Sequence, residues 1–207
     1  DRRQRQMCIR DREYATERGI LVINTPGKNT NSAAELTMGL LLSAFRKIVP
    51  AHQSMQSLNW DRHRFNGGEL MNKCLGIIGL GNVGHRVARY AKAFDMKVQA
   101  FDPYLADEVF ERHGVQKVDW ITLLNTSDVI TFHVPLNDET RGMISEMEIE
   151  RMKPGVILLN TARGGVIDET SLLNALHSGH VAAAGIDTWE VEPPRDNPFS
   201  QLPQVVM

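Results

Sequence analysis

Apolar residues along the chain follow two alternating patterns. Mostly apolar runs of five or six residues, the length of buried strands, occur at 74–78, 97–101, 128–132, 156–160 and 181–186. Elsewhere apolar residues recur at helical spacing, which predicts helices through 87–94, near 105–113, at 145–152 and between Asp168 and Gly179. Strands that alternate with helices over short connections predict an α/β fold, a doubly wound parallel sheet covered by helices on both faces.

A further helix is predicted ahead of the first strand. Ser32 and Glu35 have the spacing of a capping box, so the helix is expected to start there. Apolar residues continue at helical spacing to Ile48, and extra apolar positions widen this surface, so part of it is expected to form a subunit contact. Pro50 weakens the helical pattern. Residues 59–70 are interpreted as a connection with a pair of glycines.

The run at 74–78 leads directly into the glycine-rich sequence GLGNVG, and a helical repeat follows it. Gly79 permits a tight turn, Gly81 lets a pyrophosphate approach the backbone, and Gly84 allows close packing of helix on strand. Asp102 follows the next strand and is suited to bind ribose hydroxyls, which favours NAD over NADP. The alternatives are glycines of an ordinary tight turn and a solvated aspartate before a proline. In context, the pattern predicts a Rossmann-type dinucleotide-binding domain.

A second motif, NTARGGVIDE, begins at the end of the strand 156–160. Arg163 within it could meet a carboxylate with its two-pronged guanidinium, although an exposed salt-bridge arginine is the alternative. This motif and GIDTWEVEPP after the last strand resemble the D-isomer-specific 2-hydroxyacid dehydrogenases. The glycine turn, Asp102, HVPL at 133–136 and MKPG at 152–155 stand in that family's order.

The resemblance implies hydride transfer between NAD and C2 of a small-molecule 2-hydroxy or 2-keto acid. By the match, Arg163 binds the substrate carboxylate, and Glu192 pairs with a catalytic histidine whose pKa it raises. The family's histidine follows a strand expected to begin near 204–207, so it is expected beyond this sequence. The match further assigns the pyrophosphate to Asn82 and Val83, the adenosine to Pro135, and the nicotinamide end to Thr161, Ala162 and Asp187.

Residues 16–35 and 60–70 are most similar to the D-3-phosphoglycerate dehydrogenase branch of the family. Oxidation of 3-phosphoglycerate to 3-phosphohydroxypyruvate, a step in serine biosynthesis, is therefore the expected reaction. The sequence at 27–29 departs from the family pattern, which leaves the shape of that loop open. A hydroxypyruvate or glyoxylate reductase and an NAD-sensing, corepressor-like binding module are the alternatives.

The composition is that of a globular protein. Of 207 residues, 42% are hydrophobic, and the net charge of −2 gives no reason to expect nucleic acid as a partner. No apolar run approaches the roughly 20 residues of a membrane span, and only Cys8 and Cys74 could form a disulfide, so we expect a cytoplasmic protein without a membrane partner. No cluster of histidine, cysteine and aspartate has metal-ligand spacing, so no metal site is predicted.

The first twelve residues differ from the rest. They carry a charge of +3, against −5 for the remainder, and have neither helical nor strand periodicity. We interpret 1–12 as an adapter-like, non-native tail, with a basic arm for an anionic surface as the alternative. Residues 13–207 are assigned to an NAD-binding domain truncated before the catalytic histidine, with the substrate lobe absent. The chain alone is therefore expected to be inactive, and the full-length protein is expected to be a homodimer.

Overall fold

A computed structural model describes residues 14–21 and 27–207, so the predicted tail at 1–12 lies outside the described residues. Its centre is a seven-stranded sheet in which every neighbouring pair is parallel, in the order β3-β2-β1-β4-β5-β6-β7. The predicted α/β class is confirmed. The strands are β1 (Cys74–Ile78), β2 (Lys97–Phe101), β3 (Gln116–Lys117), β4 (Val129–Phe132), β5 (Val156–Asn160), β6 (Val181–Ile186) and β7 (Val205–Val206).

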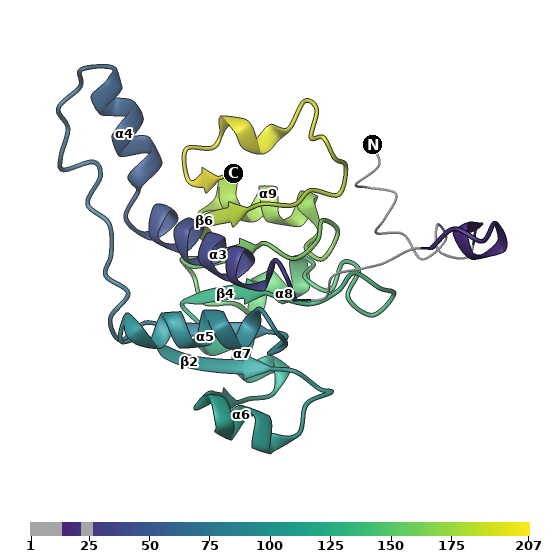
Figure 1. Cartoon of the computed structure of the whole chain (residues 1–207). Helices are drawn as coiled ribbons and strands as arrows, with labels where there is room; N and C mark the ends of the chain where they lie inside the picture. Colours follow the sequence, from purple (N-terminus) through teal and green to yellow (C-terminus); the bar gives the residue numbers. More distant parts are fainter. Residues whose placement is uncertain (1–13, 22–26) are drawn as a thin grey trace.

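Helices cover both faces of this sheet (Figure 1). Successive side chains of a strand point to opposite faces, so a strand buried on both faces contributes side chains to two hydrophobic cores. In β5, Ile157 and Leu159 pack in one core with Leu41 of α3, whereas Leu158 packs in the other with Leu172 of α9. The helices are α3 (Thr30–Phe45), α4 (Ile48–Gln56), α5 (Gly84–Ala93), α6 (Asp107–His113), α7 (Trp120–Thr126), α8 (Glu146–Arg151), α9 (Glu169–Ser178) and the 3-10 helix η1 (Pro198–Gln201).

The predicted start of α3 is wrong. The helix begins at Thr30, with Asn29 as the N-cap residue, and no side chain caps it. The amide of Ala33 donates to the carbonyl oxygen of Asn29 (2.9 Å), so the helical hydrogen bonds begin before Ser32. Ser32 therefore lies inside the first turn, where it cannot form the capping box that its spacing from Glu35 suggested.

The far end of α3 also differs from the prediction. The helix ends at Phe45, and Lys47 takes a left-handed conformation (φ 52°) before α4 begins at Ile48. The sequence did not predict α4, because Pro50 resembled a helix breaker. Proline is tolerated in a first helical turn, where its missing N–H has no intrahelical partner to lose. No residue of α4 is buried, and the helix stands away from the sheet (Figure 1).

Local capping explains where several other helices begin and end. As predicted, Asp168 caps α9: its side chain accepts a hydrogen bond from the amide of Ser171 (2.7 Å). Gly179 ends the same helix in a left-handed conformation (φ 78°), also as predicted. The sequence did not predict α7, which starts where the carboxylate of Asp119 accepts from the amide of Thr122 (2.9 Å).

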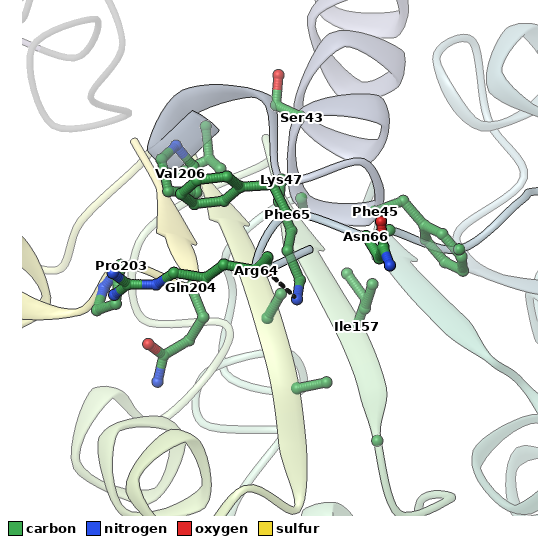
Figure 2. A pocket seen from close by; sticks show the side chains of 17 residues that line it. Ser43, Phe45, Lys47, Arg64, Phe65, Asn66, Ile157, Pro203, Gln204 and Val206 are labelled. Carbon is green, nitrogen blue, oxygen red and sulfur yellow. Dashed lines mark hydrogen bonds between the residues drawn. The ribbon is translucent and has the colours of Figure 1, made fainter. Parts of the chain in front are cut away.

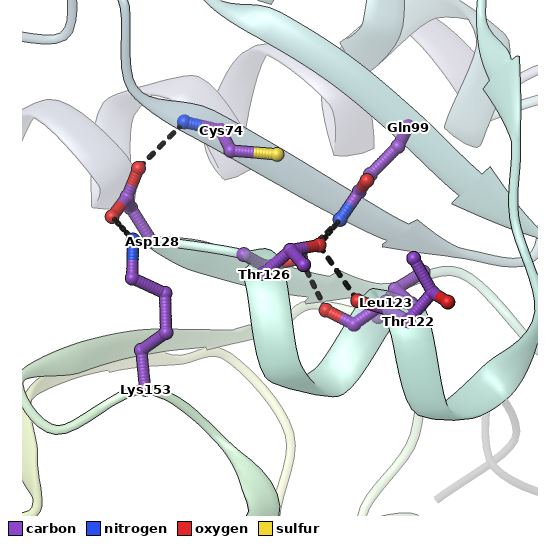
Figure 3. A network of polar contacts seen from close by, with 8 residues as sticks. Cys74, Gln99, Thr122, Leu123, Thr126, Asp128 and Lys153 are labelled. Carbon is purple, nitrogen blue, oxygen red and sulfur yellow. Dashed lines mark hydrogen bonds and ion pairs between the residues drawn. The ribbon is translucent and has the colours of Figure 1, made fainter.

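Polar contacts near the amino ends of β1 and β4 tie neighbouring strands together (Figure 3). The carboxylate of Asp128, just before β4, accepts from the amide of Cys74 in β1 (2.8 Å) and pairs with Lys153, just before β5. The side-chain amide of Gln99 in β2 donates to the buried hydroxyl of Ser127 (3.0 Å). Burial and the charge of Asp128 raise the pKa of the Cys74 thiol, which favours its neutral form.

Packing at Gly76 in β1 provides a test of this arrangement. An added Cβ would lie 2.2 Å from the Ser127 hydroxyl oxygen and 3.0 Å from Leu123, and both residues are fully buried. Gly76→Ala should therefore lower the free energy of unfolding by about 1–3 kcal/mol in urea denaturation. Gly39→Ala, at an exposed position of α3 with open space around it, should raise it by about 0.5–1 kcal/mol. Equal stability of the two variants would contradict the packing at Gly76.

Candidate functional site

The topology of the sheet defines one edge as the candidate site. Strand β1 pairs with β2 on one side and β4 on the other, so the order of the strands reverses there. In open parallel sheets, ligands bind at such a reversal, beyond the carboxyl ends of the strands. The loops after β1, β2, β4, β5 and β6 all leave from this edge. Together with Gly84, the first residue of α5, they carry every residue that the sequence predicted for the cofactor and the chemistry.

The three glycines of the turn after β1 have different structural roles. Gly79 has a positive φ of 90°, and an added Cβ would lie 2.7 Å from the carbonyl oxygen of His133. At Gly84 an added Cβ would lie 2.2 Å from the carbonyl oxygen of Gly79, so α5 packs directly on the turn. At Gly81 an added Cβ would meet nothing within 4 Å. The backbone at Gly81 therefore remains open to an approaching group.

Helix α5 begins directly after this turn. Val83 is the residue before its first turn, and Asn82 beside it is exposed. The amides of His85 and Arg86 in the first turn of α5 donate to the carbonyl oxygens of Gly81 (3.1 Å) and Val83 (3.0 Å), and the helix dipole places positive charge at this end. The His85 ring, which the sequence did not single out, bonds the carbonyl oxygen of Gly81 through Nδ1 (2.8 Å). An open backbone at a helix N-terminus fits the pyrophosphate of a dinucleotide.

Asp102 at the end of β2 is fixed by two backbone contacts. Its Oδ2 accepts from the amide of Leu80 in the glycine turn (3.0 Å), and its Oδ1 accepts from the amide of Tyr104 (3.1 Å). The carboxylate therefore lies against the glycine turn, where the sequence predicted a ribose ligand. A cavity of about 610 Å³, between β2, β3 and α6, borders it.

After β4 the chain passes His133 and Pro135. Burial lowers the pKa of His133 to about 3, so the ring is neutral at pH 7 and is a poor proton donor. Its Nε2 lies 3.1 Å from the hydroxyl of Thr131. Pro135 is exposed, and its carbonyl oxygen accepts from the hydroxyl of Thr140 (2.6 Å).

The loop after β5 is shaped by Asn160. Its side chain accepts from the amide of Ala162 (3.1 Å) and donates to the carbonyl oxygen of Arg163 (2.9 Å). The hydroxyl of Thr161 lies 2.8 Å from that of Thr37 on α3, a contact that the sequence did not reveal.

Arg163 is exposed on this loop, and it forms no salt bridge with any residue that the structure describes. Its Nη1 donates to the carbonyl oxygen of the neighbouring Ala162 (2.5 Å). Among the described residues, the alternative of a surface salt-bridge arginine finds no carboxylate partner. Most of the guanidinium N–H groups remain available for an anionic ligand.

The loop after β6 lies directly against the Arg163 loop. An added Cβ on Gly164 would lie 1.9 Å from the carbonyl oxygen of Trp189, so the two backbones touch. Glu192 on the second segment is exposed and accepts from the amide of Trp189 (3.2 Å). Desolvation and the charge of Glu192 raise the pKa of Asp187. Residues 163 and 192, 29 positions apart in sequence, are thus carried on adjoining segments.

A second cavity, of about 510 Å³, lies at the opposite edge of the sheet (Figure 2). It borders the C-terminal end of α3, the beginnings of β5 and β6, and β7, and its lining includes Phe45, Lys47, Arg64, Phe65 and Val206. This cavity contains none of the residues predicted for the cofactor. Among the described residues, no group of three or more histidine, cysteine, aspartate or glutamate side chains could hold a metal ion. No helix in the same part of the chain is long and apolar enough to cross a membrane.

Known proteins resemble this chain in sequence and in structure. D-3-phosphoglycerate dehydrogenase from Archaeoglobus fulgidus is 50% identical over 197 residues, which cover 95% of this chain and 37% of that protein. Hydroxypyruvate reductase from Thermotoga maritima is 47% identical over 186 residues, 90% of this chain and 60% of the relative. D-lactate dehydrogenase from Aquifex aeolicus, solved with NAD and lactic acid, superposes with a TM-score of 0.83 at 32% identity over 95% of this chain and 62% of that one.

The family comparison covers most of the chain. Residues 38–207 match the model of the D-isomer specific 2-hydroxyacid dehydrogenase NAD binding domain. The chain spans little more than a third of the length of its Archaeoglobus relative. The open backbone at Gly81 and the carboxylate of Asp102 beside it agree with the NAD cofactor of this domain. The chain therefore belongs to the D-isomer specific 2-hydroxyacid dehydrogenase family and contains its NAD-binding domain.

Proposed function

We propose that the whole protein is an NAD-dependent dehydrogenase that interconverts 3-phosphoglycerate and 3-phosphohydroxypyruvate. The observation that carries this proposal is Arg163: an exposed guanidinium without a carboxylate partner among the described residues, on the loop after β5. It lies at the same edge of the sheet as the glycine turn and touches the segment that bears Glu192 through Gly164. An anion-binding group beside a dinucleotide site suits a substrate with a carboxylate next to the reacting carbon.

The proposed cofactor site is formed by the loops that follow β1, β2, β4, β5 and β6. Bound NAD supplies the chemistry of accepting or returning a hydride at C2 of the substrate. Asp102 accepts hydrogen bonds from the adenosine ribose. The other proposed cofactor contacts are Gly79, Gly81, Asn82, Val83 and Gly84 at the pyrophosphate, Pro135 at the adenosine, and Thr161, Ala162 and Asp187 at the nicotinamide end.

Arg163 and Glu192 have separate roles in the proposed reaction. Arg163 binds the substrate carboxylate with two N–H groups and polarises the neighbouring carbonyl. Glu192 accepts a hydrogen bond from a catalytic histidine of the whole protein, which favours the charged imidazolium and raises its pKa. The imidazolium can then give its proton to the oxygen at C2 as the keto group is reduced.

The names of two relatives bear on the choice of substrate. The Archaeoglobus relative is named for 3-phosphoglycerate, which favours the phosphorylated substrate. The Thermotoga relative is a hydroxypyruvate reductase, so hydroxypyruvate is the second candidate. Both substrates have a carboxylate beside the reacting carbon, and they differ in the phosphate.

We further propose that 13–207 act as one cofactor domain and that the protein works in the cytoplasm.

We also propose that a second copy of the chain covers α4 and the segment after it, as expected for a homodimer. This region exposes large apolar side chains, with Leu58 91% and Trp60 78% exposed. Met55 on α4 is also exposed. Several large apolar side chains exposed within one short segment are typical of a protein interface. The cavity lined by Phe45 and Phe65 lies beside it and offers a recess for partner side chains.

Asp102→Ala should raise the Kd for NADH about tenfold or more, because it removes a charged acceptor of the ribose hydroxyls. The Kd for NADPH should change little, since the lost carboxylate also repelled the 2′-phosphate. Titration by cofactor fluorescence measures both values. Glu108→Gln removes an exposed carboxylate from α6 and should alter neither. Equal losses with the two cofactors would contradict the ribose role.

In the whole protein, kcat/KM with NADH should be higher for 3-phosphohydroxypyruvate than for hydroxypyruvate. Arg163→Lys should lower both values about 100-fold, since lysine cannot form the paired hydrogen bonds to a carboxylate. Arg151→Lys, an exposed substitution on α8, serves as the matched control and should leave both unchanged. A higher value for hydroxypyruvate would reverse the substrate assignment, and unchanged kinetics of Arg163→Lys would remove its proposed role.

Trp60→Asp should convert the dimer to a monomer in light scattering, with a dissociation constant raised about thirtyfold or more. Aspartate places a charge where an apolar partner surface is expected, so its desolvation opposes association. Met147→Asp on α8, at a side chain that is 65% exposed, should leave the mass unchanged. A dimer that persists unaltered in Trp60→Asp places the interface elsewhere.

A further inference from the structure

Two loops flank the glycine turn at the reversal of the sheet. Strands β2 and β4 are the neighbours of β1 on opposite sides, so the loops that follow them stand on either side of the turn. One hydrogen bond joins these loops: the hydroxyl of Tyr104, after β2, donates to the carboxylate of Glu139, after β4. The contact therefore spans the width of β1 at the edge where the cofactor is proposed to bind.

The Tyr104 end of this contact is tied to the glycine turn. The amide of Tyr104 donates to Oδ1 of Asp102 (3.1 Å), while Oδ2 of the same carboxylate accepts from the amide of Leu80 (3.0 Å). One carboxylate thus fixes both the turn and the backbone that carries the phenol. Asp102, which is proposed to bind the ribose, therefore also positions Tyr104.

The Glu139 end is held by its own loop. The side-chain oxygen of Asn137 accepts from the amides of Glu139 and Thr140, both at 3.0 Å. The hydroxyl of Thr140 donates to the carbonyl oxygen of Pro135 (2.6 Å). These bonds close residues 135–140 into a compact turn. They fix the backbone of Glu139 near Pro135, the proposed adenosine contact.

Packing does not hold the two side chains together. Tyr104 is 76% exposed and Glu139 is also exposed. The ordinary pKa of a tyrosine lies well above neutral pH, so the phenol is protonated and able to donate, and the hydrogen bond to the carboxylate raises the pKa of Tyr104 further. A contact between exposed side chains on well-held loops can open and close at low cost, because it involves side-chain rotation and one charge-assisted hydrogen bond.

We propose that Tyr104 and Glu139 form a clasp across the adenosine end of the cofactor crevice and slow the release of the dinucleotide. The inference rests on the proposed cofactor site at Asp102. A closed clasp joins the two loops between which the adenosine half must leave, so release requires the hydrogen bond to break first. Both side chains act as positioning residues, because they restrict the loops and take no part in hydride transfer.

The test measures NADH dissociation from the full chain by stopped-flow fluorescence. Tyr104→Phe and Glu139→Gln should each raise koff about three- to tenfold, since each weakens the same hydrogen bond. The double variant should show no more than the larger single effect, as expected for two partners of one contact. ADP-ribose keeps the adenosine half of the dinucleotide. In a displacement assay, its koff from these variants should rise by the same factor as the koff of NADH. Asp138→Asn removes the neighbouring carboxylate of the same loop and should leave koff unchanged.

The outcomes separate this inference from the proposed cofactor site. Unchanged koff in both single variants, with NADH binding still weakened by Asp102→Ala, would overturn the clasp and leave the site intact. Additive effects in the double variant, or unaltered release of ADP-ribose, would also overturn it. If Asp102→Ala binds NADH as the unsubstituted chain does, the proposed site itself fails. Unfolding curves of all variants confirm that the comparison is made on folded protein.

Discussion

The parallel alignment of the strands is the constraint on which the rest of this structure depends. Because every neighbouring pair is parallel, the carboxyl ends of all the strands lie at one edge of the sheet. The reversal of strand order at β1 then separates the loops after β2 and β4 and leaves the glycine turn between them. Residues from Gly79 to Glu192 reach a common region although more than a hundred positions separate them. The amino ends of β1 and β4, tied through Asp128 and Lys153, carry none of the residues assigned to the cofactor.

Hydrogen bonds from side chains to the backbone fix the loops at the carboxyl edge. Asp102 joins two segments of backbone, Asn160 shapes the loop of Arg163, and Asn137 closes the turn after β4. Each of these side chains accepts from amides that the strands and helices leave unpaired at their ends. Arg163 and Glu192 remain exposed on loops organised in this way. The site is thus held in place by neutral and charge-assisted hydrogen bonds, while its principal charges stay open to a ligand.

The departures from the sequence predictions have local causes. The capping box at Ser32 and Glu35 had the right spacing, but the helical ladder already begins at Asn29. Pro50 suggested a break, yet the chain breaks at Lys47 and the proline fits the first turn of α4. The two-residue strand β3 was not predicted, because it is too short for a repeating apolar pattern. Helix α7 was missed although Asp119, which caps it, is a residue type typical of helix starts. By contrast, β5 and β6 have the predicted bounds, since buried parallel strands are continuous apolar runs.

The sequence by itself determined the α/β class and the strands other than β3, and it proposed the candidate residues that the loops after those strands carry. It could do so because hydrophobic periodicity and glycine spacing are local properties of the chain. Only the tertiary structure decided which of those residues meet. The contacts of Thr37 with Thr161, Gly164 with Trp189 and Tyr104 with Glu139 join segments that are distant in sequence. No local pattern encodes such pairs, because strand order and loop packing bring them together.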